Sequence, residues 1–300
     1  GDHRDLHLSI RRQRQMCIRD RYTNSSAEYH RADASLLHTD PDGRMDIEQG
    51  KNVRVFHFAG TEHGTGVWPP TDHGVIVTGA ERAQNIRSVI DYSPLLRACL
   101  VNLDLWVTEG IDPPKSKHPR IDDGTLVPTS DLISIFSSIP GSNYPYRHAI
   151  PRRREFSADE KDEHPRILPP EIGNAFGGLV PMVDSDGNEI GGIISPEISV
   201  PVAAHTGWTL RHADIGGEGQ LLMFAGGTIP FPATESDRLT TGDPRPSIEA
   251  RYTNRDEYLS KVRASAEALV SERYLLEIDL SLIHISEPTT PRLISYAVFC

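Results

Sequence analysis

The two ends of the chain limit which part of it can fold. Residues 11–21 read RRQRQMCIRDR, and residues 280–289 read LSLIHISEPT. The apolar residues of the first run stand side by side, so the run has no apolar face at helix or strand spacing. It also lacks the long apolar core of a secretory leader and the amphipathic pattern of a mitochondrial leader. We therefore expect no ordered structure at this end of the chain.

A shared DNA origin accounts for both tails. The DNA stretch CTGTCTCTTATACACATCT can encode the start of the second tail, and its reverse complement can encode residues 15–20 of the first. This stretch resembles the transposase end used in short-read sequencing libraries. We therefore expect residues 1–21 and 280–300 to be translated adapter DNA and disordered. Residues 22–279 are then a natural segment truncated upstream, and neither a signal peptide nor a compartment can be predicted.

The natural segment is acidic. The 300-residue chain has a formal net charge of -11, and its first tail is basic, so residues 22–279 are more acidic than the whole. A nucleic-acid partner needs a basic surface, and this composition argues against one. No run approaches the roughly 18 apolar residues that cross a bilayer, so we expect no membrane span. The charge itself indicates nothing about the substrate.

Cysteine usage leaves one thiol to interpret. Cys17 and Cys300 lie in the tails, and only Cys99 belongs to the natural segment. A single cysteine can form neither an internal disulfide nor a thiolate metal cluster. Cys99 lies in the apolar helical pattern LLRACLVNL, so we predict a buried, inert thiol rather than a nucleophile.

Two segments have the patterns of a strand and a helix. In NVRVFHFAG, apolar residues alternate with polar ones up to Gly60, which predicts a strand. SPLLRACLVNLDLWVTEG predicts a helix with Ser93 as N-cap, Pro94 in the first turn and Gly110 at the stop. The expected apolar stripe of this helix consists of Leu96, Leu100, Leu103 and Val107.

The remaining patterns are less regular. Residues 111–171 are rich in proline and weak in periodicity, which predicts a long irregular wrap. In LVPMVDSDGNEIGGIIS, two apolar runs around Asp186-Gly187 predict a β-hairpin. A calcium loop is the weaker alternative for the cluster of Asp184, Asp186, Asn188 and Glu189, because the glycine comes too early for that motif.

The end of the natural segment predicts helices. Asn254 and Glu257 have the spacing of a capping box, which marks the start of a helix. The expected core-facing stripe of this helix consists of Leu259, Val262, Ala266, Leu269 and Val270.

The stretch VRVFHFAGTEHGTG carries the clearest chemical signal. The predicted strand leads into a turn that contains His63 and three glycines, Gly60, Gly64 and Gly66. An exposed imidazole at the end of a rigid strand can act as a general base, although a merely solvated histidine is the simpler interpretation.

A zinc site is the alternative for the same stretch. His57, Glu62 and His63 resemble the motif H-x-x-E-H, but too many residues separate His57 from Glu62. Along an extended strand, the two histidines would also stand about 20 Å apart. We therefore expect no metal.

Five blocks of sequence, taken in order, resemble a known family. They are NSSAEYHRADASLLHTDPDGRMD, VRVFHFAGTEHG, LRACLVNLDLWVTEGIDPPKSKHP, DSDGNEIGGIISPEISVPVAAHTGWTLR and GGTIPFPATESDRLTTGDPRPSIEARY. Together they are similar to the C-terminal half of large, mostly uncharacterised α/β-hydrolase domain-containing proteins, over nearly all of residues 22–279. The resemblance implies an α/β fold class, here the C-terminal portion of an α/β-hydrolase fold with an irregular Pro/Gly-rich wrap and a β-hairpin. It also implies a serine hydrolase that acts on small-molecule esters without a cofactor.

The resemblance also assigns catalytic roles. In α/β-hydrolases the order along the chain is nucleophile, acid, histidine, and the nucleophile lies in a G-x-S-x-G turn. By resemblance His63 is the general base and Glu28 the acid that orients it, with Asp33 and Asp46 as weaker matches for the acid. A helix N-terminal charge is the alternative role of Glu28. No G-x-S-x-G occurs in the chain, so we expect the nucleophile upstream and this chain to be inactive by itself.

Two further blocks, HTGWTLRH and GGTIPFPATESDR, have no mechanism of their own. Trp208, Arg211 and Phe231, together with Pro230 and Arg238, could line a substrate pocket, because aromatic and arginine side chains often do. They could also pin the irregular wrap to the sheet, which is the interpretation that we favour.

Two other functions stay open. A degenerate hydrolase scaffold can serve as a non-catalytic interaction domain, because a fold does not guarantee its chemistry. A metal-dependent hydrolase built on His57 and His63 is the other. The oligomeric state is not predicted. A truncated sheet exposes a strand edge and apolar helix faces, so we expect low solubility when residues 22–279 are expressed alone.

Overall fold

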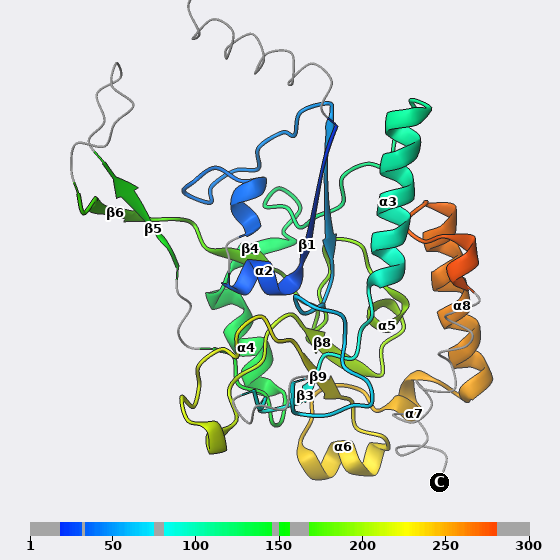
Figure 1. The fold of residues 1–300 in the computed structure, drawn as a ribbon. Helices are drawn as coiled ribbons and strands as arrows, with labels where there is room; N and C mark the ends of the chain where they lie inside the picture. The colour runs from blue at the N-terminus through cyan, green and yellow to red at the C-terminus, as the bar shows by residue number, and fades with distance from the viewer. Residues whose placement is uncertain (1–18, 32–33, 75–80, 146–149, 157–167, 281–300) are drawn as a thin grey trace, which may run out of the picture.

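The computed structural model describes residues 19–31, 34–74, 81–145, 150–156 and 168–280 (Figure 1). The predicted tails, apart from residues 19–21 and 280, therefore lie outside the described residues. In Figure 1 a parallel pair of strands stands at the centre, long helices lie along one side of it, and short antiparallel strands lie at its lower end. No helix in the described part of the chain is long and apolar enough to cross a membrane.

The central pair consists of β1 (Asp20–Ser25) and β2 (Val53–Phe58). The two strands are parallel, and Ser25 lies opposite Phe58, so both end at the same level. The strand predicted from NVRVFHFAG is thus confirmed. β1 begins at Asp20, ahead of the expected boundary at Tyr22, because strand pairing uses backbone groups and is indifferent to the side chains that carry them.

The second edge of β2 is also covered. Phe56 forms a parallel bridge with Lys117, and Phe58 forms one with Ile193. β2 is therefore flanked on both sides, which buries residues 55–58 almost completely. This internal strand gives the turn that follows it a rigid support.

Helix α3 (Ser93–Thr108) forms where the sequence predicts it, with Pro94 in its first turn. The expected apolar stripe is wrong at Leu100 and Val107, which are 60% and 56% exposed, whereas Leu96 and Leu103 are partly buried. The buried face instead consists of Leu95, Ala98, Cys99, Asn102 and Trp106. Apolar residues lie nearly all round this helix, so periodicity alone could not identify the face that packs on β2. Ser93 is not the N-cap either, since the cap position is Tyr92 without a side-chain bond.

Cys99 belongs to a core formed by β2, α3 and the C-terminal helix. Burial raises the pKa of its thiol to about 11, so the reactive thiolate is scarce at neutral pH. The prediction of a buried thiol is confirmed.

We predict that iodoacetamide at neutral pH leaves Cys99 unmodified in the native protein and alkylates it in urea. Peptide mapping by mass spectrometry measures both states at this position. Rapid alkylation of Cys99 without urea would contradict the buried thiol.

The C-terminal helix α8 (Arg255–Ser271) begins at the predicted cap. The Asn254 side chain accepts the N–H of Glu257 at 2.9 Å, while the Glu257 carboxylate accepts the N–H of Thr253 at 2.8 Å. The expected stripe is confirmed: Val262, Ala266 and Leu269 are buried, and Leu259 and Val270 are partly buried against the cores.

Replacing Asn254 with alanine is expected to lower the free energy of unfolding by about 1 kcal/mol, because a helix N–H loses its acceptor. Urea denaturation followed by circular dichroism measures the loss. Asn254→Asp is the matched control, since it retains an acceptor at the cap and should stay close to the wild type. Equal losses in both variants would show that the cap bond is not the cause.

A second and larger core joins the antiparallel strands β8 (Ala203–Thr206) and β9 (Gly227–Pro230) to helices from both ends of the chain. It includes Tyr29 near the start of the described chain and Tyr258 in α8. The remaining elements are α2 (Ser26–Arg31), η1 (Ala34–Leu37), β3 (Ile86–Arg87), β4 (Leu126–Pro128), α4 (Ser130–Ser138), β5 (Arg152–Glu155), β6 (Glu171–Ala175), β7 (Leu179–Pro181), α5 (Pro196–Ser199), η2 (Ala213–Ile215), α6 (Glu235–Thr241) and α7 (Ile248–Arg251).

The wrap expected over residues 111–171 is only partly irregular. It contains helix α4 and strands β4 and β5, and β6 begins at its end. Leu132 and Phe136 stand one turn apart in α4 and are almost completely buried, so this short helix forms by packing on the larger core. The helix is only nine residues long, so its apolar residues span too few turns for a sequence prediction.

The hairpin predicted around Asp186-Gly187 is a tight turn with little strand on either side. β7 leads into it, and Val183 and Glu189 form a single antiparallel bridge across it. Gly187 has a φ of 92°, which glycine adopts without strain. The Asp184 carboxylate accepts two backbone N–H groups of the turn, which is a structural role. The turn therefore explains this cluster better than a calcium loop does.

Candidate active site

The two central strands each lead into one of the candidate catalytic residues. β1 continues directly into α2, whose first turn contains Glu28. β2 is followed by the turn that contains His63. Because the carboxyl ends of parallel strands meet at one edge of a sheet, both side chains lie at that edge. His63 Nδ1 is 2.5 Å from Glu28 Oε1, so the structure brings the two residues into hydrogen-bond contact.

The contact determines which atom of His63 is left to react. When Nδ1–H donates to the carboxylate, the neutral ring has Nε2 as its acceptor. The His63 side chain is 58% exposed and that of Glu28 only 20%. The imidazole is therefore accessible while the carboxylate is largely shielded. Such a pair can take up a proton at Nε2 and stabilise the imidazolium that results.

Glu28 is held on its second oxygen as well. Oε2 accepts the hydroxyl of Ser25, the last residue of β1. Two occupied oxygens restrict the rotamer of the carboxylate. Its place in the first turn of α2 also puts it near the positive end of the helix dipole, so the helix-charge role and the orienting role are compatible.

Two aromatic residues hold His63 in place. Its backbone N–H donates to the Phe224 carbonyl at 3.1 Å, and the Tyr92 hydroxyl donates to its carbonyl at 2.6 Å. The Phe224 ring packs on the imidazole with 4.7 Å between centroids. Phe224 has a φ of 54°, which is rare for a bulky residue and persists only where the surroundings impose it. The strained backbone thus puts an aromatic face against the candidate base.

The weaker matches for the acid have other positions. Asp33 lies outside the described residues. Asp46 accepts the backbone N–H groups of Ile121 and Asp122 and pairs with Arg120. Burial raises the pKa of Asp46, but these hydrogen bonds outweigh burial and hold the pKa below its usual value. Its carboxylate therefore anchors a loop.

The three residues considered for zinc are held in three different contacts. His57 is completely buried and its Nε2 lies 2.8 Å from Glu189. The Glu62 carboxylate accepts a hydrogen bond from the Arg87 guanidinium at 3.0 Å and another from the backbone N–H of Gly226 at 2.8 Å. Burial raises the pKa of Glu62 in spite of the neighbouring arginine. Over the described ranges no group of three potential ligands could hold a metal ion.

Trp208 and Phe231 are packed inside the larger core. Both are 4% exposed. Trp208 meets Phe136 edge-on with 4.9 Å between ring centroids, and the Phe231 ring lies under the guanidinium groups of Arg245 and Arg251. These contacts support the pinning role, because neither side chain is open to a ligand. Arg238 pairs with Glu235 on its own helix.

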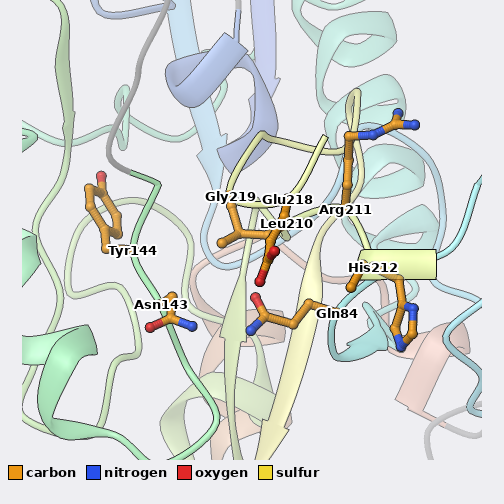
Figure 2. A pocket seen from close by; sticks show the side chains of 9 residues that line it. Gln84, Asn143, Tyr144, Leu210, Arg211, His212, Glu218 and Gly219 are labelled. Carbon is orange, nitrogen blue, oxygen red and sulfur yellow. The ribbon is translucent and has the colours of Figure 1, made fainter. Parts of the chain in front are cut away.

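Arg211 borders a cavity of about 400 Å³ that is lined by both polar and apolar atoms. Figure 2 shows Gln84, Asn143 and Glu218 converging on this space, whereas the guanidinium of Arg211 points away from them. That guanidinium donates to the backbone carbonyls of residues 215 and 216. The full lining consists of Gln84, Asn143, Tyr144, Leu210, Arg211, His212, Ala213, Glu218 and Gly219. The segment that bears Arg211 continues to Phe224, which contacts His63.

The sequence analysis did not identify Phe224, most of the cavity lining, or the buried role of Glu189. Phe224 and the residues that line the cavity beside Arg211 stand in stretches without periodicity, and nothing in the sequence distinguishes them. The sequence pattern presents Glu189 only as part of a turn, yet its carboxylate contacts His57. A buried role for a charged residue can be recognised only when its partners, here more than a hundred positions away, are known.

Comparison with known proteins gives one match. A family model described as an alpha/beta hydrolase domain matches residues 9–283. No curated protein and no solved structure gave a significant match.

Proposed function

Because the chain belongs to the α/β-hydrolase domain family, we propose that Glu28 and His63 are the acid and the base of a serine-type esterase. The observation that carries this proposal is the 2.5 Å contact between His63 Nδ1 and Glu28 Oε1 at the carboxyl edge of two parallel strands. The order along the chain, acid before histidine, is that of α/β-hydrolases. The substrate class is a small-molecule ester.

The mechanism assigns each group one task. A serine hydroxyl attacks the ester carbonyl while its proton passes to Nε2 of His63. Glu28 accepts the hydrogen bond from Nδ1–H and stabilises the imidazolium. His63 then returns the proton to the leaving alkoxide, which departs as an alcohol and leaves an acyl-serine. Water, activated by the same imidazole, releases the acid and restores the serine.

The serine itself is proposed to lie in a segment encoded upstream. No G-x-S-x-G turn occurs in the 300 residues, and in this fold the nucleophile precedes the acid along the chain. β2 is largely buried and supports the turn after it, while the imidazole of His63 stays exposed. Both features are compatible with a base that accepts its proton from a serine in another segment of the fold. By this proposal, the chain without that segment does not hydrolyse esters.

The test begins with the natural gene, read across both ends of residues 22–279. An upstream reading frame with a strand, a G-x-S-x-G turn and a helix is the expected result. The protein from that gene should react with a fluorophosphonate probe and hydrolyse p-nitrophenyl esters. Probe labelling and ester hydrolysis should both be lost in the serine-to-alanine variant, and both should be strongly reduced in His63→Ala.

A non-catalytic scaffold is the second candidate, and the missing nucleophile turn is the observation that favours it. A natural gene without any upstream serine turn, or one that truly encodes RRQRQMCIRDR and SLIHISEPT, would overturn the esterase proposal. The protein would then be examined for binding partners rather than for turnover.

A further inference from the structure

One buried carboxylate contacts both of the segments that carry the candidate acid and base. Glu189 Oε2 lies 2.8 Å from His57 Nε2 and 2.9 Å from the backbone N of Gly60, at the start of the histidine turn. Its Oε1 accepts the hydroxyl of Ser26, the first residue of α2. The donors come from β2, from the turn after β2 and from α2. Glu189 therefore joins three segments through a single side chain.

The burial of this carboxylate requires those donors. Glu189 is 4% exposed and His57 is completely buried. An isolated buried carboxylate costs several kcal/mol, and only pairing and hydrogen bonds offset that cost. Each of the two oxygens has at least one donor here, so the carboxylate has a preferred position. A displacement of α2 would break the bond from Ser26, and a displacement of the histidine turn would break the bond from Gly60.

The carboxylate is itself supported by a rigid turn. The side chain of the preceding residue, Asn188, accepts the N–H of His205 at 2.9 Å and donates to the Ala203 carbonyl at 3.1 Å. Both partners belong to β8. Gly192 packs so closely on His57 that a Cβ there would meet its ring at 2.5 Å. Glu189 is thus fixed to the antiparallel sheet, and it holds the two catalytic loops against that sheet.

We propose that Glu189 is a positioning residue that sets the separation of Glu28 and His63. The inference rests on the proposed function, because only a catalytic pair needs such a separation. Among the described residues, the hydrogen bonds of Glu189 reach neither Glu28 nor His63, and it acts through Ser26 and Gly60. Without it, α2 and the histidine turn keep their direct backbone bond from the Ala27 N–H to the Thr61 carbonyl at 3.3 Å, but they lose the side chain that ties both to the antiparallel sheet. The hydrogen bond from Nδ1 to the acid is then enforced less strictly.

The experiment measures the tautomer of His63 in the full chain labelled with ¹⁵N-histidine. Long-range ¹H–¹⁵N spectra at a pH where the ring is neutral distinguish Nδ1–H from Nε2–H, and His63→Ala assigns the signals. The wild type should show Nδ1–H alone. Glu189→Ala should show a mixture with Nε2–H, the form that a free imidazole prefers in water.

The conservative variant Glu189→Gln should retain Nδ1–H. Its amide oxygen can accept from His57 and Gly60, while its amide NH₂ donates to the Ser26 hydroxyl, which can turn to accept. A role through geometry therefore predicts rescue by glutamine. Ser26→Ala removes only the α2 contact and should give a smaller admixture of Nε2–H, which keeps the test informative if Glu189→Ala does not fold.

Asp243→Ala is the matched control, because Asp243 is a buried carboxylate that pairs with Arg245, and this arginine contacts β9. It should lose stability and keep His63 as Nδ1–H. An unchanged tautomer in both Glu189→Ala and Ser26→Ala, or an equal change in Asp243→Ala, would overturn the positioning role. The tautomer of His63 is measured without ester hydrolysis. A natural gene without a serine turn would therefore refute the proposed function, while the tautomer spectra would still show whether Glu189 positions the pair.

Discussion

Replacing Asp243 with alanine is expected to lower the free energy of unfolding by about 3–5 kcal/mol, because it leaves a buried guanidinium without its counter-ion. Arg245 is only 1% exposed at its side chain. Its Nε and Nη2 donate to Asp243 at 2.9 Å and 2.7 Å, and its other donors reach the carbonyls of Ile229 and Pro230 in β9. Urea denaturation followed by tryptophan fluorescence measures the loss.

Glu235→Ala is the matched control, since it removes a carboxylate from Arg238 in an exposed pair. Solvent screens that pair, so its loss should be much smaller than that of Asp243→Ala. Similar losses in the two variants would contradict the role assigned to burial.

The same pair predicts a pH dependence. Burial raises the pKa of Asp243, but hydrogen bonds from Arg245 outweigh it and hold the pKa below its usual value. The contribution of Asp243 is therefore present above the unfolded pKa of about 4 and is lost as the pH falls through the lower folded pKa. Below about pH 4, the wild type should lose stability more steeply than Asp243→Ala. Parallel curves in that range would show that Asp243 is not responsible.

Replacing Glu28 with glutamine, in the protein that carries the proposed upstream serine, is expected to lower kcat by about 10³–10⁴-fold with little change in KM. The amide can present its NH₂ to Nδ1 and favour the tautomer with hydrogen on Nε2, which cannot accept the serine proton. Initial rates with p-nitrophenyl esters over a range of substrate concentrations separate kcat from KM.

Asp46→Asn tests the competing choice of acid. Asp46 accepts backbone N–H groups of a loop, so its amide variant should keep most of kcat even where stability falls. Loss of kcat in Asp46→Asn together with normal turnover in Glu28→Gln would reverse the assignment of the acid.

Part of the site could be predicted from the sequence. The turn with His63 follows a strand whose alternating pattern is strong, and the resemblance to a family supplies the order of acid and base. Glu28 was harder, because its own surroundings are equally compatible with a helix N-terminal charge. Parallel pairing of β1 with β2 carries both strand ends to one edge and brings Glu28 into contact with His63, which no local pattern could show.

Other features could not be read from local patterns. Helix α3 is apolar on several faces, so the choice of Leu95 and Trp106 over Leu100 and Val107 depended on where β2 lies. Helix α4 is too short for its apolar residues to show a period, and it forms because the larger core accepts Phe136. In both cases the deciding energy is burial against distant segments, which a short window of sequence does not contain.

The sequence by itself determined the elements whose cause is local: the alternation of β2, the cap of α8 at Asn254, the turn at Gly187 and the inert place of Cys99 in an apolar run. Each depends on backbone preference or on neighbours within a few residues. Only the tertiary structure decided the rest. The strain at Phe224, the cavity beside Arg211 and the contacts of Glu189 with two loops arise where segments far apart in the chain meet. The reason is that hydrogen bonds and burial act through space rather than along the sequence.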